Sequence, residues 1–448
     1  MRKKLIAVVA MFVLSGSSFG LTLNEAIASA EKIDPQVQGA LANSNAARAG
    51  IQVARSKLLP SVQGVGSYGR TNQTANNVDP NYGLYTTKYV NSTPSSQVYL
   101  RQALFRMADW AGLGISELQN EYGLMKLAGA YGDLWFRVSN AWFDLVAAQE
   151  TLDIQTDAEN SMSLVALQAQ KAYEAGIGTR DSALEAKAQL AFTRSNAIEA
   201  KLNLVARQKG FEILTGVDVE ALRKAHPNFT KKYRVLPGAE KNFLVKVNHS
   251  SPEILSAKLA EEIRRLQLKQ AKYGDYPTVD LYGSYQQTLN NNINQIGLGV
   301  ISSQAALQLT IPFYSGGLYE GQARQAAAYL ESASADIKAS ELRLTTGVQT
   351  NWATQGSQED RVKALQEMVS SGQEVVNAYR MGVAAGIKSW SDVANAEVVL
   401  TKRRVDQVNA IGLLLKAQAQ LLSFLPVTDE IWSVWISGLS FEVGKSKK

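Results

Sequence analysis

The most regular hydrophobic pattern lies near the C-terminus, where apolar or small residues recur at alternating steps of four and three. This series consists of Ala394, Val398, Thr401, Val405, Val408, Gly412, Leu415, Ala419 and Leu422. A partial second series consists of Leu400, Ile411, Leu414, Leu421 and Leu425. Steps of four and three form the heptad seam of a coiled coil. Two seams predict two neighbouring helices, although an ordinary helical bundle would give a similar pattern.

Residues 95–226 and 313–425 contain no proline. Because proline interrupts helices, these two stretches can hold long ones. Glycines break the first stretch around Gly176 and the second around Gly382. Each stretch therefore predicts two antiparallel helices joined by a short loop. A helix over 319–385 would be roughly 100 Å long, which implies coiled-coil packing.

The two halves of the chain repeat each other. Segment 34–68 matches segment 251–285 at a constant offset of 217 positions, with at least eight identities and no gap. The short loops between the paired long helices, which we call the tips, match at an offset of 210 through the dipeptides Gly176-Ile177 and Gly386-Ile387. Each half is predicted to contain a helix, a strand, a loop, a second strand, a long helix, a tip and a final helix. We expect a first repeat at 21–230, a second at 231–425 and a C-terminal tail at 426–448, with both repeats in one elongated domain.

Four segments alternate apolar and polar residues with the period of two that a β-strand shows. The apolar face of these strands includes Val62, Tyr68, Leu100, Leu281, Tyr285 and Leu309. The opposite face includes Gln63, Ser67, Asp280 and Ser284. Such alternation over about ten residues is typical of a transmembrane β-barrel whose apolar face contacts lipid. A single soluble strand would look the same, but the repetition favours the membrane interpretation. Segments 72–95 and 289–300 are predicted to be loops.

Four strands cannot close a barrel by themselves, because the smallest single-chain barrels have about eight strands. Open sheet edges do not occur in lipid. The strand count therefore requires several chains, and a symmetric ring is the usual arrangement. Three chains would supply twelve strands, which is enough to enclose a lumen.

The N-terminus has the three parts of a secretory signal. Arg2, Lys3 and Lys4 are followed by an apolar run over 5–14 and by a segment of mostly small residues that ends at Gly20. Because a membrane span needs about 20 apolar residues, we expect a cleaved signal at 1–20 and not an anchor. Its removal lowers the formal net charge from +6 to +3. No basic stripe with interleaved aromatic residues remains, so we expect no nucleic-acid partner.

The composition leaves little room for catalytic or metal chemistry. The chain has no cysteine and only two histidines. The lack of cysteine excludes disulfides, thiolate zinc sites and a lipidated cysteine. With two histidines, a histidine-rich metal site is also excluded. The sequence contains neither a Gly-x-Ser-x-Gly nor a His-Glu-x-x-His motif. We therefore expect no enzyme activity, cofactor or metal ion.

Several short motifs follow one another in a specific order. They are 21–26 with Asp34-Pro35, Leu59-Pro60, Gln102-Ala103-Leu104-Phe105 with Trp110, 311–317, and the tip segments 172–176 and 378–382. In this order, and together with the duplication, they make the chain resemble the TolC family of outer-membrane efflux and secretion channels over essentially all of its mature length. Trp110 and the motif before it, with the absence of cysteine, are similar to the type I secretion branch.

The resemblance implies an α+β membrane protein from the outer membrane of a Gram-negative bacterium. Long antiparallel coiled-coil helices would form an α-barrel tunnel in the periplasm, and four strands per chain would contribute to a trimeric 12-stranded β-barrel. A homotrimer would contact outer-membrane lipid, a periplasmic adaptor (membrane fusion) protein and an inner-membrane ABC transporter or proton-driven pump. Type I protein secretion is the function it favours. Multidrug efflux is the first alternative, and a periplasmic coiled-coil adaptor protein is an alternative of another class.

The resemblance also points to candidate site residues. Those of the adaptor-docking tips are Gly176, Ile177, Gly178, Gly382 and Gly386. Those of the periplasmic gate are Tyr379, Lys388, Asp392, Asn395 and Asp181. Hydrogen bonds and ion pairs between helices would hold the gate shut, and one helix pair would untwist to open it.

The gate departs from the family pattern in several places. Lys388 stands where the family has arginine, so a bidentate contact becomes a point-charge contact. Asn395 stands where the family has a second aspartate. Asp181 lies one position before the family aspartate of the first half, where this chain has Ser182. Compared with the family pattern, four extra residues lie between Tyr379 and Gly386. This insertion leaves open whether Tyr379 contacts the gate. Asp392 has an alternative role as a helix cap, since aspartate favours helix starts.

Overall fold

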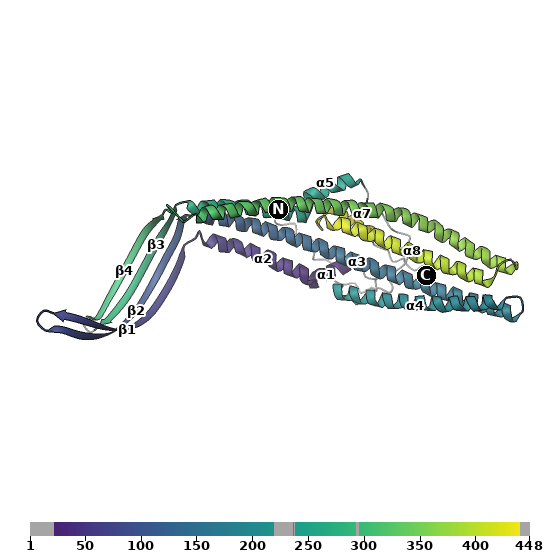
Figure 1. The fold of residues 1–448 in the computed structure, drawn as a ribbon, viewed down its shortest axis with the longest axis horizontal. Coiled ribbons are helices and arrows are strands. Elements are labelled where there is room, and N and C mark those ends of the chain that lie inside the picture. Colours follow the sequence, from purple (N-terminus) through teal and green to yellow (C-terminus); the bar gives the residue numbers. More distant parts are fainter. Residues whose placement is uncertain (1–21, 219–235, 237, 293–294, 440–448) are drawn as a thin grey trace, which may run out of the picture. The chain divides into compact units, whose positions relative to one another are not determined.

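The computed structural model describes residues 22–218, 236, 238–292 and 295–439 (Figure 1). The predicted signal, residues 1–20, lies outside them. The first half contains α1 (Leu23–Ile33), α2 (Pro35–Ser56), β1 (Ser61–Asp79), β2 (Gly83–Phe105), α3 (Met107–Glu174) and α4 (Arg180–Thr215). The second half contains α5 (Glu240–Ser250), α6 (Pro252–Lys272), the short 3₁₀ turn η2 (Tyr273–Asp275), β3 (Thr278–Asn292), β4 (Gln295–Thr310), α7 (Leu318–Ala384), α8 (Trp390–Ser423) and α9 (Glu430–Leu439).

The chain divides into two compact units, each of which contains segments of both halves of the sequence. The helical unit comprises 1–39, 127–252 and 341–448. The sheet unit comprises 40–126 and 253–340. Within the part of the chain that the structure describes, no helix has the length and apolar character needed to span a membrane.

The sheet unit holds one antiparallel sheet with the strand order β1-β2-β3-β4. Its strands have 19, 23, 15 and 16 residues, more than the ten that the alternation predicts. The predicted loops at 72–95 and 289–300 are wrong, because most of their residues continue the two hairpins. Cross-strand pairing stabilises these polar extensions, as where the Thr86 hydroxyl donates to Asn76 Oδ1 at 2.9 Å.

The register places the predicted apolar positions on one face of the sheet. Val62 is opposite Leu100 on β1 and β2, and Leu281 is opposite Leu307 on β3 and β4. Tyr285 is opposite Val98 between β2 and β3, so the same face continues across the centre of the sheet. Because side chains alternate between faces, the residues opposite one another in this register share a side.

In the helical unit, α3 with α4 and α7 with α8 form two antiparallel pairs (Figure 1). The predicted helix over 319–385 corresponds to α7, which has 67 residues. The two predicted seams of α8 are largely buried: Ala394, Val408, Leu415, Ala419 and Leu422 in the first, and Leu400, Ile411, Leu414, Leu421 and Leu425 in the second. The coiled-coil periodicity therefore identified the packed faces of this helix.

The range 426–448, which we predicted to be a tail, contains α9. Trp432 is fully buried, and its ring meets the rings of Trp135 at 5.3 Å and Trp435 at 5.8 Å in edge-on contacts. The indole N–H of Trp435 donates to Gln418 Oε1 of α8 at 2.8 Å. These contacts pack α9 into the aromatic core of the helical unit.

Candidate functional site

The loop between α3 and α4 ends α3 with a Schellman motif. The N–H of Gly176 donates to the carbonyl of Tyr173, and the N–H of Ile177 donates to the carbonyl of Ala172, both at 3.0 Å. Gly176 has a φ of 73°, the left-handed conformation that this motif requires and that glycine adopts without strain.

The loop between α7 and α8 has the same backbone geometry. The N–H of Gly386 donates to the carbonyl of Val383 at 3.0 Å, and that of Ile387 donates to the carbonyl of Gly382 at 2.9 Å. Gly386 has a φ of 74°. The repeat in the sequence thus corresponds to a repeat in hydrogen bonding at the two tips.

The tips differ in where they lack a side chain. In the first tip, a Cβ added to Gly178 would lie 3.1 Å from the Cβ of Ala172. In the second tip these positions are reversed, because Lys388 has the side chain and Gly382 lacks one. A Cβ added to Gly382 would lie 2.8 Å from Cγ of Lys388. At each tip, the space between these two positions holds only one side chain. Gly382, near the end of α7, is buried and lacks a side chain because that of Lys388 fills this space.

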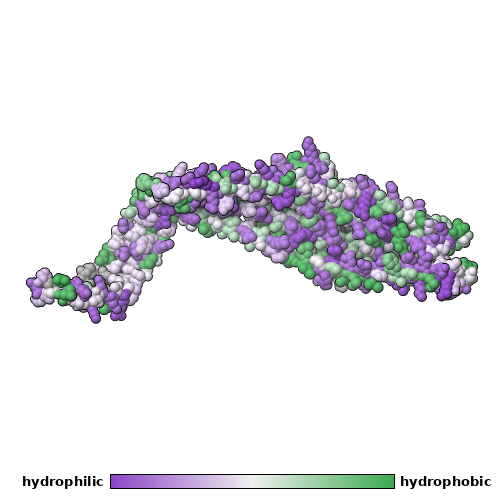
Figure 2. Space-filling model, in the orientation of Figure 1, coloured by the Kyte–Doolittle hydropathy of each residue, from purple (hydrophilic) through white to green (hydrophobic). Residues whose placement is uncertain are grey.

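Both tips expose apolar side chains at their ends. Ile177 is 85% exposed and Ile387 is 79% exposed, and Met381 beside the second tip is 68% exposed. Figure 2 shows hydrophobic surface at the end of the α7–α8 pair. In a Schellman motif a hydrophobic residue at the position of these isoleucines commonly packs back on its helix. Here both isoleucines remain at the surface.

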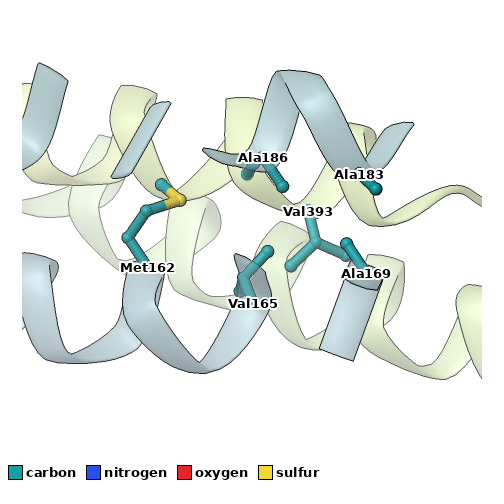
Figure 3. Close-up of a cluster of buried hydrophobic side chains, with 7 residues drawn as sticks. Met162, Val165, Ala169, Ala183, Ala186 and Val393 are labelled. Carbon is teal, nitrogen blue, oxygen red and sulfur yellow. The ribbon is translucent and has the colours of Figure 1, made fainter. Parts of the chain in front are cut away.

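A hydrophobic cluster holds the two helix pairs together just behind the tips. It consists of Met162, Val165 and Ala169 from α3, Ala183 and Ala186 from α4, and Val393 and Ala394 from α8 (Figure 3). Tyr379 of α7 packs against it. All four long helices therefore contribute to one small core near their ends.

Tyr379 and Lys388, two predicted gate residues, are in contact. The ammonium of Lys388 lies 4.3 Å from the centre of the Tyr379 ring, a distance at which a cation–π interaction is favourable. The extra residues after Tyr379 therefore do not carry it away from the second tip.

Asp392 forms a capping box at the start of α8. Its Oδ2 accepts from the N–H and from the hydroxyl of Ser389, both at 2.9 Å, while its own N–H donates to Ser389 Oγ at 3.2 Å. These hydrogen bonds to Ser389, backbone first and hydroxyl second, lower the pKa of Asp392 from its ordinary value, and the charge of Lys388 adds to the effect. Asp392 therefore takes part in the cap of α8, whose N-cap residue is Ser389.

Asn395 connects the two helix pairs. Its Oδ1 accepts from Gln189 Nε2 at 3.3 Å, and its Nδ2 donates to Glu185 Oε1 at 3.1 Å. Close by, the N–H of Ser391 donates to the hydroxyl of Ser182 at 3.1 Å. The interface between α4 and α8 is therefore made of polar side chains around the small apolar cluster.

Asp181 lies in the first turn of α4, next to Ser182, and its side chain is exposed. Within the described residues, no hydrogen bond or ion pair joins it to Tyr379, Lys388 or Asp392. The structure brings the other candidates together around the start of α8 and leaves Asp181 at the edge of this group.

Two polar contacts within the α7–α8 pair were missed. Arg380 Nη2 lies 2.5 Å from Glu397 Oε1, and the Glu397 side chain is only 10% exposed. One heptad further from the tip, Arg404 Nη2 donates to Gln373 Oε1 at 2.6 Å. Both pairs are symmetric about the second tip, so antiparallel pairing of the two helices could have revealed them.

Residues 26–217 and 244–425 match the outer membrane efflux protein family. The alkaline protease secretion protein AprF of Pseudomonas aeruginosa is 24% identical over 433 residues, which covers 94% of this chain and 87% of AprF. The outer membrane protein TolC of Escherichia coli is 23% identical over 452 residues, covering 96% and 87% of the two chains.

The fold agrees with solved channel structures. The CmeC outer membrane channel of Campylobacter jejuni superposes with a TM-score of 0.74 at 15% identity, and the alignment covers 96% of this chain and 94% of CmeC. This confirms the predicted fold class of tunnel helices combined with barrel strands. The family match covers most of the sequence and includes both tips. The chain belongs to the outer membrane efflux protein family and is an outer-membrane channel of the TolC type.

Proposed function

We propose that this channel is the exit duct of a type I protein secretion system. The observation that supports this most directly is the similarity to a protease secretion protein over nearly the whole chain. In this proposal an inner-membrane ABC transporter and a periplasmic adaptor deliver an unfolded polypeptide to the duct. The duct itself is passive and needs no cofactor.

A deletion strain tests this proposal against the alternative of drug efflux. Loss of a small set of proteins from the culture medium, with unchanged sensitivity to toxic compounds, is the expected result. Complementation with the full-length gene should restore secretion. Raised drug sensitivity with an unchanged set of secreted proteins would favour drug efflux and a proton-driven pump.

The assembly that fits this function is a homotrimer. In one chain β1 and β4 are the two edges of the sheet. Lipid does not tolerate unpaired edges, so β4 of one chain pairs with β1 of the next until twelve strands close the barrel. The mass of the detergent-solubilised complex tests this, and a monodisperse monomer would contradict it.

The gate in this proposal lies between α4 and α8. A hydrogen bond to a charged group contributes about 1.5–3 kcal/mol and a neutral one about 0.5–1.5 kcal/mol. Arg380 and Glu397 join α7 to α8 with both partners charged, whereas α8 meets α4 through a neutral bond, Ser391 to Ser182, and through Asn395 to Glu185, in which only the acceptor is charged. We therefore expect α7 and α8 to move together, away from α4.

Engineered cysteine pairs can test whether α8 separates from α4, because the chain has no cysteine of its own. Ser182→Cys with Ser391→Cys should lock the tip, and secretion should return on reduction. Gly372→Cys with Leu400→Cys, which joins α7 to α8 at positions whose Cβ atoms would lie 4.0 Å apart, is the matched control and should leave secretion unchanged. Equal inhibition by both pairs would show that the gate opens elsewhere.

The exposed isoleucines are the proposed contacts for the apex of the adaptor. Ile177→Asp and Ile387→Asp should reduce secretion while trimers still form, since each places a charge on an apolar contact. Ile213→Asp is the control, because Ile213 is 82% exposed but lies at the other end of α4. Secretion lost equally in all three variants would argue against docking at the tips.

A further inference from the structure

A buried carboxylate in the sheet unit is neutralised by one arginine. The side chain of Asp280 on β3 is 3% exposed. Arg106, just after β2, binds it with both arms of its guanidinium: Nε donates to Oδ1 at 2.8 Å and Nη2 donates to Oδ2 at 2.6 Å. This bidentate geometry balances the charge of Asp280.

A second arginine lies beside this pair and adds a positive charge. Arg101 Nη2 is 3.7 Å from Oδ2 of Asp280, beyond hydrogen-bond distance. The Arg101 guanidinium is 5.8 Å from the centre of the Tyr282 ring, and its side chain is 48% exposed. Arg101 is thus held in position while its charge remains open to solvent.

Arg101 projects from the polar face of the sheet. It is opposite Tyr282 in the register, and its neighbour Leu100 lies on the apolar face. Along this polar face, the stretches 61–69, 95–103, 278–286 and 302–310 contain only two charged residues, Arg101 and Asp280. With Arg106 included, the group carries a net charge of one positive unit per chain.

We propose that Arg101 is a selectivity-determining residue of the pore, which attracts carboxylate groups on the exported cargo. This rests on the proposed function, in which the polar face lines the lumen of a trimeric barrel. Three copies of Arg101 then form a ring around one axis. Rings of arginine favour anions, and a guanidinium fork matches the geometry of a carboxylate.

The ring acts over a distance set by ionic strength. The screening length is about 30 Å at 0.01 M salt and about 3 Å at 1 M. The effect of Arg101 on permeation should therefore be large in dilute salt and nearly absent in concentrated salt. A purely structural role for Arg101 would show no such dependence.

Reversal potentials of purified trimers in planar bilayers under a KCl gradient test the proposal. Arg101→Gln should raise the ratio of cation to anion permeability by about twofold or more near 0.01 M salt, and by much less near 1 M. Arg101→Met, which retains an apolar stem over Tyr282, should behave in the same way. Arg101→Lys should remain close to the wild type because it keeps the charge.

Lys88→Gln is the matched control. It removes one positive charge from the same strand, thirteen residues away and on the opposite face, and should leave selectivity unchanged. A poly-L-glutamate probe should block the wild type several-fold more strongly than Arg101→Gln in dilute salt. Neutral variants that assemble and conduct like the wild type, with the same selectivity and block, would overturn the proposal. A wild-type chain that forms no trimeric pore would instead overturn the proposed function on which it rests.

Discussion

The ammonium of Lys388 lies over the ring of Tyr379, 4.3 Å from its centre. The contact joins the end of the α7–α8 loop to the last turns of α7, beside the cluster that holds all four long helices. A cation–π contact at an exposed site contributes about 0.5–1 kcal/mol. Lys388 thus makes a contact on its own helix pair, next to the interface with α4.

Lys388→Ala should raise the resting conductance of the channel and leave trimer assembly intact. Loss of the cation–π contact frees the loop at the start of α8, where Ser391 binds Ser182. Single-channel recordings in planar bilayers measure this. Lys388→Arg, which retains a cation for the ring, should keep the low conductance of the wild type. If the Lys388→Ala channel had the same low resting conductance as the wild type, this contact would not be what holds the tip shut.

Gly382→Ala should loosen the second tip, because the new Cβ would lie 2.8 Å from Cγ of Lys388. Overpacking of this kind costs about 1–3 kcal/mol. Hydrogen exchange at the amides of Ile387 and Lys388, which both donate to the carbonyl of Gly382, should become faster.

The compensating variant Gly382→Ala with Lys388→Gly recreates the arrangement of the first tip, where Ala172 faces Gly178. It should slow this exchange again relative to Gly382→Ala alone. No recovery in the double variant would contradict the steric explanation.

Asp392→Asn separates a gate role from a capping role. If three copies of Asp392 line the constriction, the variant should be less cation-selective. If Asp392 only completes the cap of α8, the change should lower local stability slightly, because asparagine keeps an acceptor oxygen for Ser389, and leave the reversal potential as it was. Normal assembly with unchanged selectivity decides for the cap.

The pH dependence of the same site follows from the lowered pKa of Asp392. A carboxylate with a lowered folded pKa stabilises the folded state above its unfolded pKa, near 3.8, and loses this contribution as the pH falls through the folded value. The Asp392 contribution to selectivity and to the α8 cap should therefore be constant between about pH 7 and pH 5. A change with a midpoint inside that range would have to come from another group.

Leu281→Arg should impair membrane insertion more than Ser284→Arg. Leu281 shares the apolar face with Leu307, whereas Ser284 is opposite Gln304 on the polar face. Arginine on the lipid face costs about 2–4 kcal/mol at mid-depth. The yield of folded protein in isolated outer membranes measures the difference, and equal yields would show that the assigned facing is wrong.

The amino-acid sequence determined those features that depend on local periodicity. Heptad spacing predicted the buried seams of α8, and the two proline-free stretches predicted the long helices, with α7 displaced by only one residue. Alternation predicted which strand residues share a face, as Val62 and Leu100 do. These properties follow from the geometry of single helices and strands, which a sequence displays directly.

The tertiary structure decided what depends on partners that are distant in the sequence. The strands extend through Asn- and Thr-rich segments because cross-strand pairing, as between Asn76 and Thr86, outweighs the turn-like composition. Asp392 takes part in the cap of α8 because Ser389 lies within reach, and Arg101 carries surplus charge because Arg106 meets both oxygens of Asp280. Such outcomes depend on angles and on distances of a few ångströms between elements, which residue spacing along the chain does not encode.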